Sequence, residues 1–118
     1  MKEIIKFEPP DTMVLLFTGK LPADDVRNMF VKWADYVKPG EKSKVLIDAS
    51  TLEDIPPKTR EALREGANKF PMSKLAVFGA TTKMRIMGGL IIKMVPGVDQ
   101  STFVKTEEEA RAWLRKEK

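Results

Sequence analysis

The stretch Lys44-Val45-Leu46-Ile47-Asp48 decides the fold class, because its apolar residues are consecutive and do not alternate with polar ones. Strands that are buried on both faces have this pattern, and such strands usually pair in parallel in a sheet covered by helices. Leu75-Ala76-Val77-Phe78 repeats the pattern further along the chain. We therefore expect both segments to be interior strands of a parallel sheet.

The segments around these two strands alternate between strand and helix patterns. The expected strands are residues 4–7, 13–18, 44–48, 75–78 and 101–104, with a loop over residues 49–56. The expected helices are residues 22–37, 57–70 and 83–95 and a fourth that follows a capping box at residues 106–109. The order β-β-α-β-α-β-α-β-α predicts an α/β fold with a mixed, mostly parallel five-stranded sheet and four helices, joined by right-handed crossovers.

The composition is that of one globular domain spanning residues 1–118. The absence of Cys and His excludes disulfides, zinc sites built on thiolate or imidazole, and histidine-based catalytic triads. The serines are scattered over separate segments and have no histidine to activate them. We expect a non-enzymatic protein with no metal and no cofactor.

The charges are 21 Lys and Arg against 17 Asp and Glu, a net charge of +4. Because the signs alternate along most segments, this excess predicts a solvated surface rather than a nucleic-acid site. The sequence has no secretory signal pattern and no apolar run near the roughly 20 residues that a membrane span needs. These features make the cytoplasm the expected compartment.

Two polar loops follow interior strands, at the sheet edge where open α/β folds bind ligands. The first contains Ser50, Thr51 and Asp54, which are candidates for ligand or partner contacts but are also ordinary turn residues. The second leads into the third helix, and there an anion would find helix amides and two cations. Its hydroxyls are equally expected as helix caps. The candidates in this second loop are Thr81, Thr82, Lys83 and Arg85.

The third predicted helix is unusually apolar, since its large aliphatic and Met side chains cover about half of its circumference. Met84, Met87 and Ile91 lie in this arc, and Ile92 lies outside it. Gly88 removes a side chain where another chain or a ligand can approach. Two interpretations stay open: a deeply packed helix with Met as filler, or an adaptable surface for a ligand or a partner.

Four segments resemble the STAS fold family, the sulfate-transporter and anti-sigma-factor-antagonist domains. They are Phe17-Thr18-Gly19-Lys20-Leu21, Val45-Leu46-Ile47-Asp48, Leu75-Ala76-Val77-Phe78-Gly79 and the stretch from Phe103 to Leu114. Within that family the chain is most similar to small stand-alone bacterial and archaeal STAS-like proteins related to the CRAL-TRIO lipid-transfer fold. The relation to lipid carriers implies that the third helix is part of a gate or a lipid-facing wall.

In the antagonist members of the family, a regulatory phosphoserine lies at the start of the second helix. The matching segment here is Ile55-Pro56-Pro57-Lys58-Thr59, which contains no serine. Thr59 is its only hydroxyl and is a candidate for ligand or partner contacts. The resemblance therefore implies an antagonist-type protein without a serine phosphoswitch.

These observations predict a non-enzymatic binding module that engages an apolar or amphipathic, lipid-like ligand or a protein partner through the start of the second helix and the third helix. The alternative is an anti-sigma-factor-antagonist-type regulator that binds a protein partner without phosphoswitching. A homodimer is compatible with either interpretation.

Overall fold

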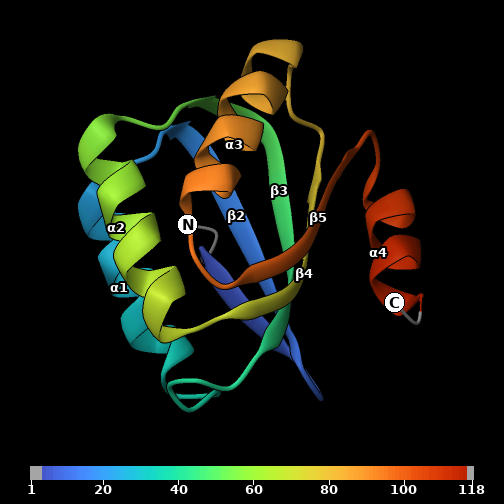
Figure 1. The fold of residues 1–118 in the computed structure, drawn as a ribbon. Helices are drawn as coiled ribbons and strands as arrows, with labels where there is room; N and C mark the ends of the chain where they lie inside the picture. Colours follow the sequence, from blue (N-terminus) through green and yellow to red (C-terminus); the bar gives the residue numbers. More distant parts are fainter. Residues whose placement is uncertain (1–3, 117–118) are drawn as a thin grey trace.

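The computed structural model describes residues 4–116, and in it five strands form one sheet whose spatial order follows their order in the chain (Figure 1). The strands β1 and β2 are antiparallel, and all other neighbours are parallel. The strands are β1 (Ile5–Glu8), β2 (Thr12–Lys20), β3 (Ser43–Asp54), β4 (Met72–Phe78) and β5 (Val98–Val104). The helices are α1 (Ala23–Trp33), α2 (Pro57–Lys69), α3 (Thr82–Met94) and α4 (Glu107–Arg115). The predicted fold class is confirmed.

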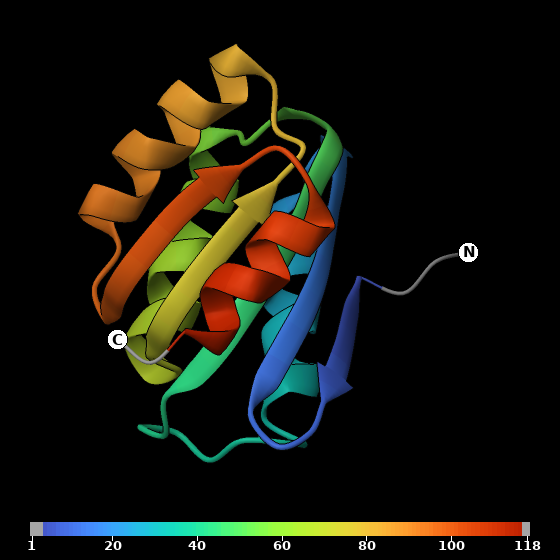
Figure 2. The ribbon, with the colours of Figure 1, turned by 90° about the vertical axis from the view of Figure 1, so that its right-hand side faces the viewer.

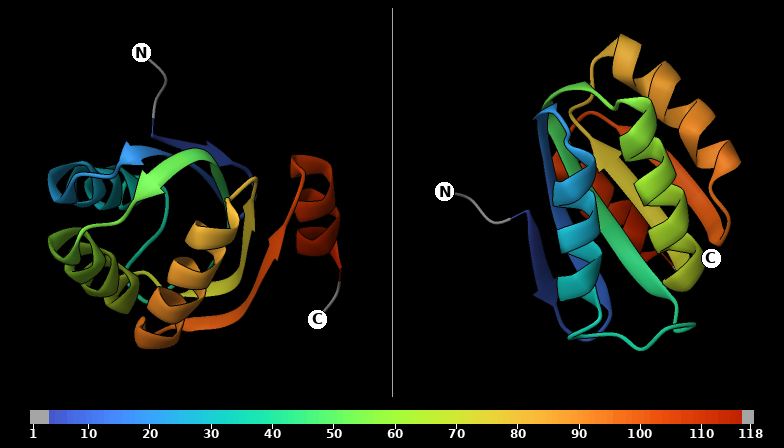
Figure 3. Two further views of the ribbon diagram at one scale, coloured as in Figure 1. Left: turned by 90° about the horizontal axis from the view of Figure 1, so that it is seen from above. Right: turned by 90° about the vertical axis from the view of Figure 1, so that its left-hand side faces the viewer.

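Helices α1, α2 and α3 cover one face of the sheet, and α4 covers the other (Figure 3). The three crossovers from β2 to β5 all step in the same direction across the sheet. Because such connections are right-handed, they place their helices on a single face. Figure 2 shows α4 lying across the opposite face.

The two faces of β3 and β4 belong to separate apolar cores, which explains their unbroken apolar sequences. Val45 and Leu75 point into the larger core beneath α1, α2 and α3. Leu46 and Ala76 lie in the smaller core under α4 together with Leu114. The prediction that these strands are buried on both faces is confirmed.

The predicted loop over residues 49–56 is wrong for most of its length, because β3 continues to Asp54. Thr51, Leu52 and Asp54 pair with the end of β2, with register shifts along the ladder. Ala49 and Leu52 are buried, and this burial keeps the extension in the sheet. Turn-forming residues were a poor guide here, because pairing with β2 supplies partners for the backbone groups of this segment.

Helix α1 is shorter than predicted, ending at Trp33 instead of residue 37. The next residues form a turn, in which the amide of Tyr36 donates to the carbonyl of Trp33. Val37 still packs against the main core, so its apolar spacing reflects burial beyond the helix end.

Helix α4 is tied to the edge strand by an ion pair that makes stability depend on pH. Arg111 Nη1 and Nη2 donate to the two carboxylate oxygens of Glu8 at 2.7 and 3.0 Å. These hydrogen bonds lower the pKa of Glu8 below its ordinary value of 4.5. A depressed pKa in the folded state stabilises the fold above the unfolded pKa, and this contribution is lost as the pH falls through the folded value.

We expect Glu8→Gln to lower the free energy of unfolding by about 1 kcal/mol near neutral pH. The difference from the wild type should shrink as the pH falls below 4.5, because the wild-type carboxyl then becomes protonated. Urea denaturation at a series of pH values measures both quantities. Asp24→Asn is the control, since Asp24 pairs with Arg27 in a largely exposed geometry. Equal pH dependence in wild type and Glu8→Gln would contradict the role of this pair.

Candidate functional site

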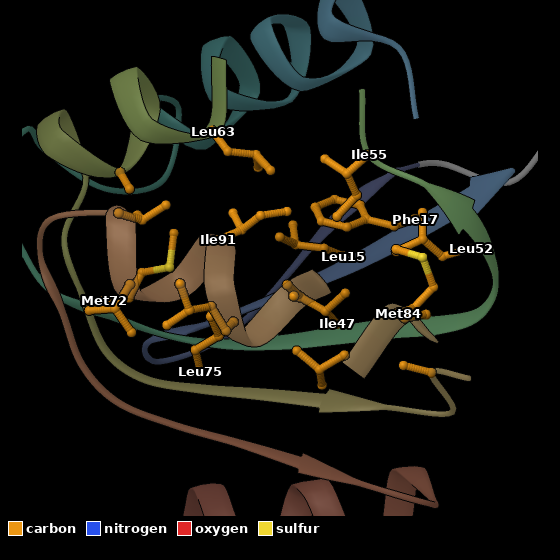
Figure 4. A pocket seen from close by; sticks show the side chains of 18 of the residues that line it. Leu15, Phe17, Ile47, Leu52, Ile55, Leu63, Met72, Leu75, Met84 and Ile91 are labelled. Atoms are coloured by element: carbon orange, nitrogen blue, oxygen red, sulfur yellow. The ribbon is translucent and has the colours of Figure 1, made fainter. Parts of the chain in front are cut away.

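An apolar cavity of about 80 Å³ lies between the sheet and α1, α2 and α3. Its lining residues are all apolar and come from four strands, three helices and the adjoining loops. Figure 4 shows Leu15, Ile47, Leu63 and Met84 projecting around it from different elements. A water molecule needs only about 10–15 Å³ but also polar partners, which these side chains do not provide. The cavity is therefore suited to an apolar group.

A surface groove of about 1090 Å³ runs between α2 and α3. Ile91 and Val95 line both the groove and the cavity, so their side chains form part of the wall between the two. An apolar segment that displaced this wall would pass from the groove into the core. We refer to the groove and cavity together as the α2–α3 site.

The apolar arc of α3 is divided between core and solvent. Met84 and Ile91 are buried, at 2% and 9% exposure, and both line the cavity. The opposite side of the arc is an exposed stripe of three residues spaced one turn apart. Their exposed fractions are 64% for Ile86, 59% for Leu90 and 75% for Met94. Met87 is half-buried between them on the groove. Met84 is thus a wall residue of the cavity alone, whereas Ile91 lies in the wall that the cavity shares with the groove.

The face of α3 that packs against the sheet is not centred on the predicted apolar arc. Ile92, expected to lie outside the arc, is half-buried and lines the cavity. Gly88 also faces inward, where an added Cβ would lie 2.9 Å from the Phe103 ring. The group that approaches Gly88 is therefore an aromatic side chain of β5. Close packing on Phe103 rotates the helix so that Ile92 turns toward the sheet.

The groove carries most of the excess positive charge of the chain. Its lining includes four cations, Arg60, Arg64, Lys83 and Lys93, and one carboxylate, Glu61. The net charge of the whole chain is +4. None of these five groups forms an ion pair within residues 4–116. The α2–α3 site is thus apolar inside and cationic at its rim.

Arg60 links the two walls of the groove. Its Nε donates to the carbonyl of Ile55 at 2.8 Å, and its Nη2 lies 3.8 Å from the sulfur of Met87. Sequence reasoning did not identify Arg60 or Arg64, because both belong to a helix of mixed charge. Their spacing of four residues on one helix face was the available signal.

The candidates at the end of β3 do not line the cavity or the groove. The amide and hydroxyl of Ser50 both donate to Asp48, at 3.0 and 2.6 Å. Asp54 accepts from the amide of Ile55, and Thr51 is exposed on the strand. Among residues 4–116 there is no cluster of acidic side chains that could hold a metal ion. Local turn-like contacts account for Ser50 and Asp54.

The four candidates in the loop before α3 and its first turn do not form one site in the structure. Thr81 is the N-cap and accepts from the amide of Met84 at 3.2 Å, so its hydroxyl caps the helix. Lys83 lines the groove, whereas Thr82 and Arg85 do not line it. Of these four residues, Lys83 alone joins the α2–α3 site.

Thr59 is placed in the core and not on a binding surface. It is 1% exposed, and its Oγ1 donates to the carbonyl of Leu21 at 2.6 Å. Its side chain lines neither the cavity nor the groove, so Thr59, predicted as a contact residue, is not part of the α2–α3 site. The chain following β2 passes over the start of α2 and covers the hydroxyl, a contact across 38 residues that local sequence does not reveal.

Over the described part of the chain, no helix has the length and apolarity to cross a lipid bilayer.

Comparison with known proteins identifies the fold family. A solved structure of an uncharacterized protein with a SpoIIAA-like fold from Shewanella loihica PV-4 has a TM-score of 0.68 and 19% sequence identity, covering 93% of this chain and 90% of that chain. No curated protein matches the sequence. A family model described as SpoIIAA-like matches residues 12–115, which span almost all of the sheet and every helix. The chain therefore belongs to the SpoIIAA-like family.

Proposed function

We propose that this protein is a non-enzymatic binding module for a small amphipathic ligand, held in the α2–α3 site. SpoIIAA-like domains are generally non-enzymatic, and their fold is that of a regulatory or binding module. The observation that carries the proposal is the apolar cavity beneath α3, separated from an open groove by Ile91 and Val95. An exposed patch without a cavity would favour a protein partner instead.

The side chains that line the site suit a ligand with an apolar chain. Cavities lined by aliphatic and aromatic side chains stay dry and accept apolar molecules. Met84 and Met87, on one side of α3, are flexible and polarizable, so they can repack around an inserted chain. Burying one aliphatic side chain fully contributes roughly 1.5–3 kcal/mol. Net binding therefore needs walls that are already in place, because association itself costs free energy.

We expect 1-decanol to bind the wild-type protein and to bind Val95→Phe roughly tenfold more weakly. The added ring would occupy the space between groove and cavity and exclude the ligand chain from it, and a tenfold loss of affinity corresponds to about 1.4 kcal/mol. Binding is measured by NMR titration of methionine methyl groups. Met84, Met87 and Met94 report on the site, and Met13 serves as an internal reference because it lines neither the cavity nor the groove.

The matched control is Val31→Phe, which makes the same change on α1 at a side chain that is 69% exposed. This variant should bind 1-decanol like the wild type. Native mass spectrometry of the purified protein complements the titration by detecting a retained small molecule. Failure of 1-decanol to perturb the site methyl groups, or equal affinity in wild type and Val95→Phe, would overturn the proposed function.

A protein partner is the second candidate, and the exposed stripe of α3 favours it. Ile86, Leu90 and Met94 form a continuous apolar row that a monomer leaves in water. An antagonist-type regulator that binds its partner through this row would need no phosphorylated hydroxyl, in agreement with the burial of Thr59. Sedimentation velocity over a range of protein concentrations distinguishes a second copy of this chain from a different partner.

A further inference from the structure

The rim of the groove carries positive charge that an uncharged ligand would not pair. Arg64 and Lys83 face the groove from opposite walls. Neither side chain has a hydrogen bond or an ion pair within residues 4–116, and both are exposed. Cations that lie unpaired beside an apolar groove complement an anionic group that carries an apolar chain.

We infer that the ligand of the α2–α3 site is an anionic amphiphile with a single chain, an inference that rests on the proposed function. Its carboxylate or phosphate lies near Arg60, between Arg64 and Lys83 along the groove. Its chain lies over Met87 and passes Ile91 toward the cavity. A volume of about 80 Å³ fits the end of one slender chain and not a fused ring system.

The contact between Arg60 and Met87 and the position of the cavity wall give the ligand a direction. Arg60 contacts the Met87 sulfur, and Lys83 precedes Met87 by one turn of α3. Arg64 follows Arg60 by one turn of α2. Because α2 and α3 run in the same direction, Lys83 and Arg64 lie on either side of the contact between Arg60 and Met87, and the three cations extend along the groove. The head group is placed at the contact between Arg60 and Met87, in the middle of these cations, and the chain then reaches Ile91 in the cavity wall one turn further along α3.

The test compares three amphiphiles with the same ten-carbon chain: decanoate, 1-decanol and decyltrimethylammonium. The two ionic amphiphiles are titrated below their micelle concentrations, and 1-decanol below its solubility limit, into the wild type and into the double variant Arg64→Gln, Lys83→Gln. Methionine methyl NMR signals report binding. The control double variant is Lys32→Gln, Lys58→Gln, which removes the same net charge from exposed residues of α1 and α2 that do not line the groove.

We expect the groove variant to bind decanoate roughly five- to tenfold more weakly, as two partly exposed ion pairs are lost. Its affinity for 1-decanol should be unchanged, and its affinity for decyltrimethylammonium should rise. The control variant should bind decanoate like the wild type. Raised salt should weaken decanoate binding by the wild type and leave 1-decanol binding unaffected.

The outcomes separate this inference from the proposed function. If 1-decanol binds but decanoate affinity is the same in the wild type and the groove variant, the site exists and the anionic specificity is wrong. An equal loss of decanoate affinity in both double variants shows a general charge effect and also overturns the inference. If none of the three amphiphiles binds the wild type, the proposed function fails and the inference fails with it.

Discussion

Replacing Thr59 with aspartate is expected to lower the free energy of unfolding by about 4 kcal/mol or more at neutral pH. The threonine hydroxyl is buried in the first turn of α2 and donates to the Leu21 carbonyl at 2.6 Å. An ionised carboxylate in this position has no proton to donate and would face that carbonyl oxygen away from water. Urea denaturation followed by circular dichroism measures the loss.

Two further variants separate charge from the hydrogen bond. Thr59→Ser keeps the hydroxyl and removes one methyl group, so it should cost about 1 kcal/mol. Thr59→Val keeps the shape but leaves the Leu21 carbonyl without its donor, at a cost of about 1–3 kcal/mol. The expected order of stability is wild type, serine, valine and then aspartate.

The aspartate variant should also respond to pH in a defined direction. Burial raises the pKa of the introduced carboxyl in the folded state, so the folded protein binds its proton more tightly than the unfolded chain does. Its stability deficit should therefore shrink as the pH falls. Wild-type stability of Thr59→Asp at neutral pH would contradict the buried position.

Replacing Gly66 with alanine is expected to lower the free energy of unfolding by about 1–3 kcal/mol, although alanine is the better helix former. A Cβ on Gly66 would lie 2.1 Å from the ring of Phe30, where α2 crosses α1. That ring is 8% exposed and stacks on Trp33, with ring centroids 5.1 Å apart. The ring can give way only by disturbing this stack.

Gly89 is the matched control, because it is also a helical glycine but has open space where its Cβ would be. Gly89→Ala should raise the free energy of unfolding by about 0.5–1 kcal/mol. The double variant Gly66→Ala, Phe30→Leu should be less destabilised than the sum of the two single variants, since the clashing ring is gone. Independent, additive effects of these two substitutions would show that Gly66 is not limited by Phe30.

The fold class was predictable because its determinants are local. Continuous apolar runs such as Val45-Leu46-Ile47 require cover on both faces, and apolar spacing with terminal caps indicates the helices between them. The cap at Thr81 shows this, since its partner is the amide of Met84 in the same turn. The end of β3 was missed because its extension depends on pairing with β2, which lies far back in the sequence.

The candidate site was only partly predictable. The width of the apolar arc indicated that α3 has more apolar surface than one core face can bury, and the exposure of Leu90 and Met94 agrees with this. Which side faces inward depended on Gly88 packing against Phe103, a contact between separate elements. The rim cations Arg60 and Arg64 gave no distinct pattern in a helix that also carries Glu61 and Glu65.

The sequence by itself determined the order of elements, the sheet with strands buried on both faces and the apolar character of α3. These follow from hydrophobic periodicity and caps, which act over a few residues. The tertiary structure alone decided that Thr59 is buried, that a cavity remains beneath α3 and that cations of α2 meet the groove. The physical reason is that a cavity is the volume left over after side chains from seven elements have packed together. That remainder depends on the distance between α2 and α3, which no local segment specifies.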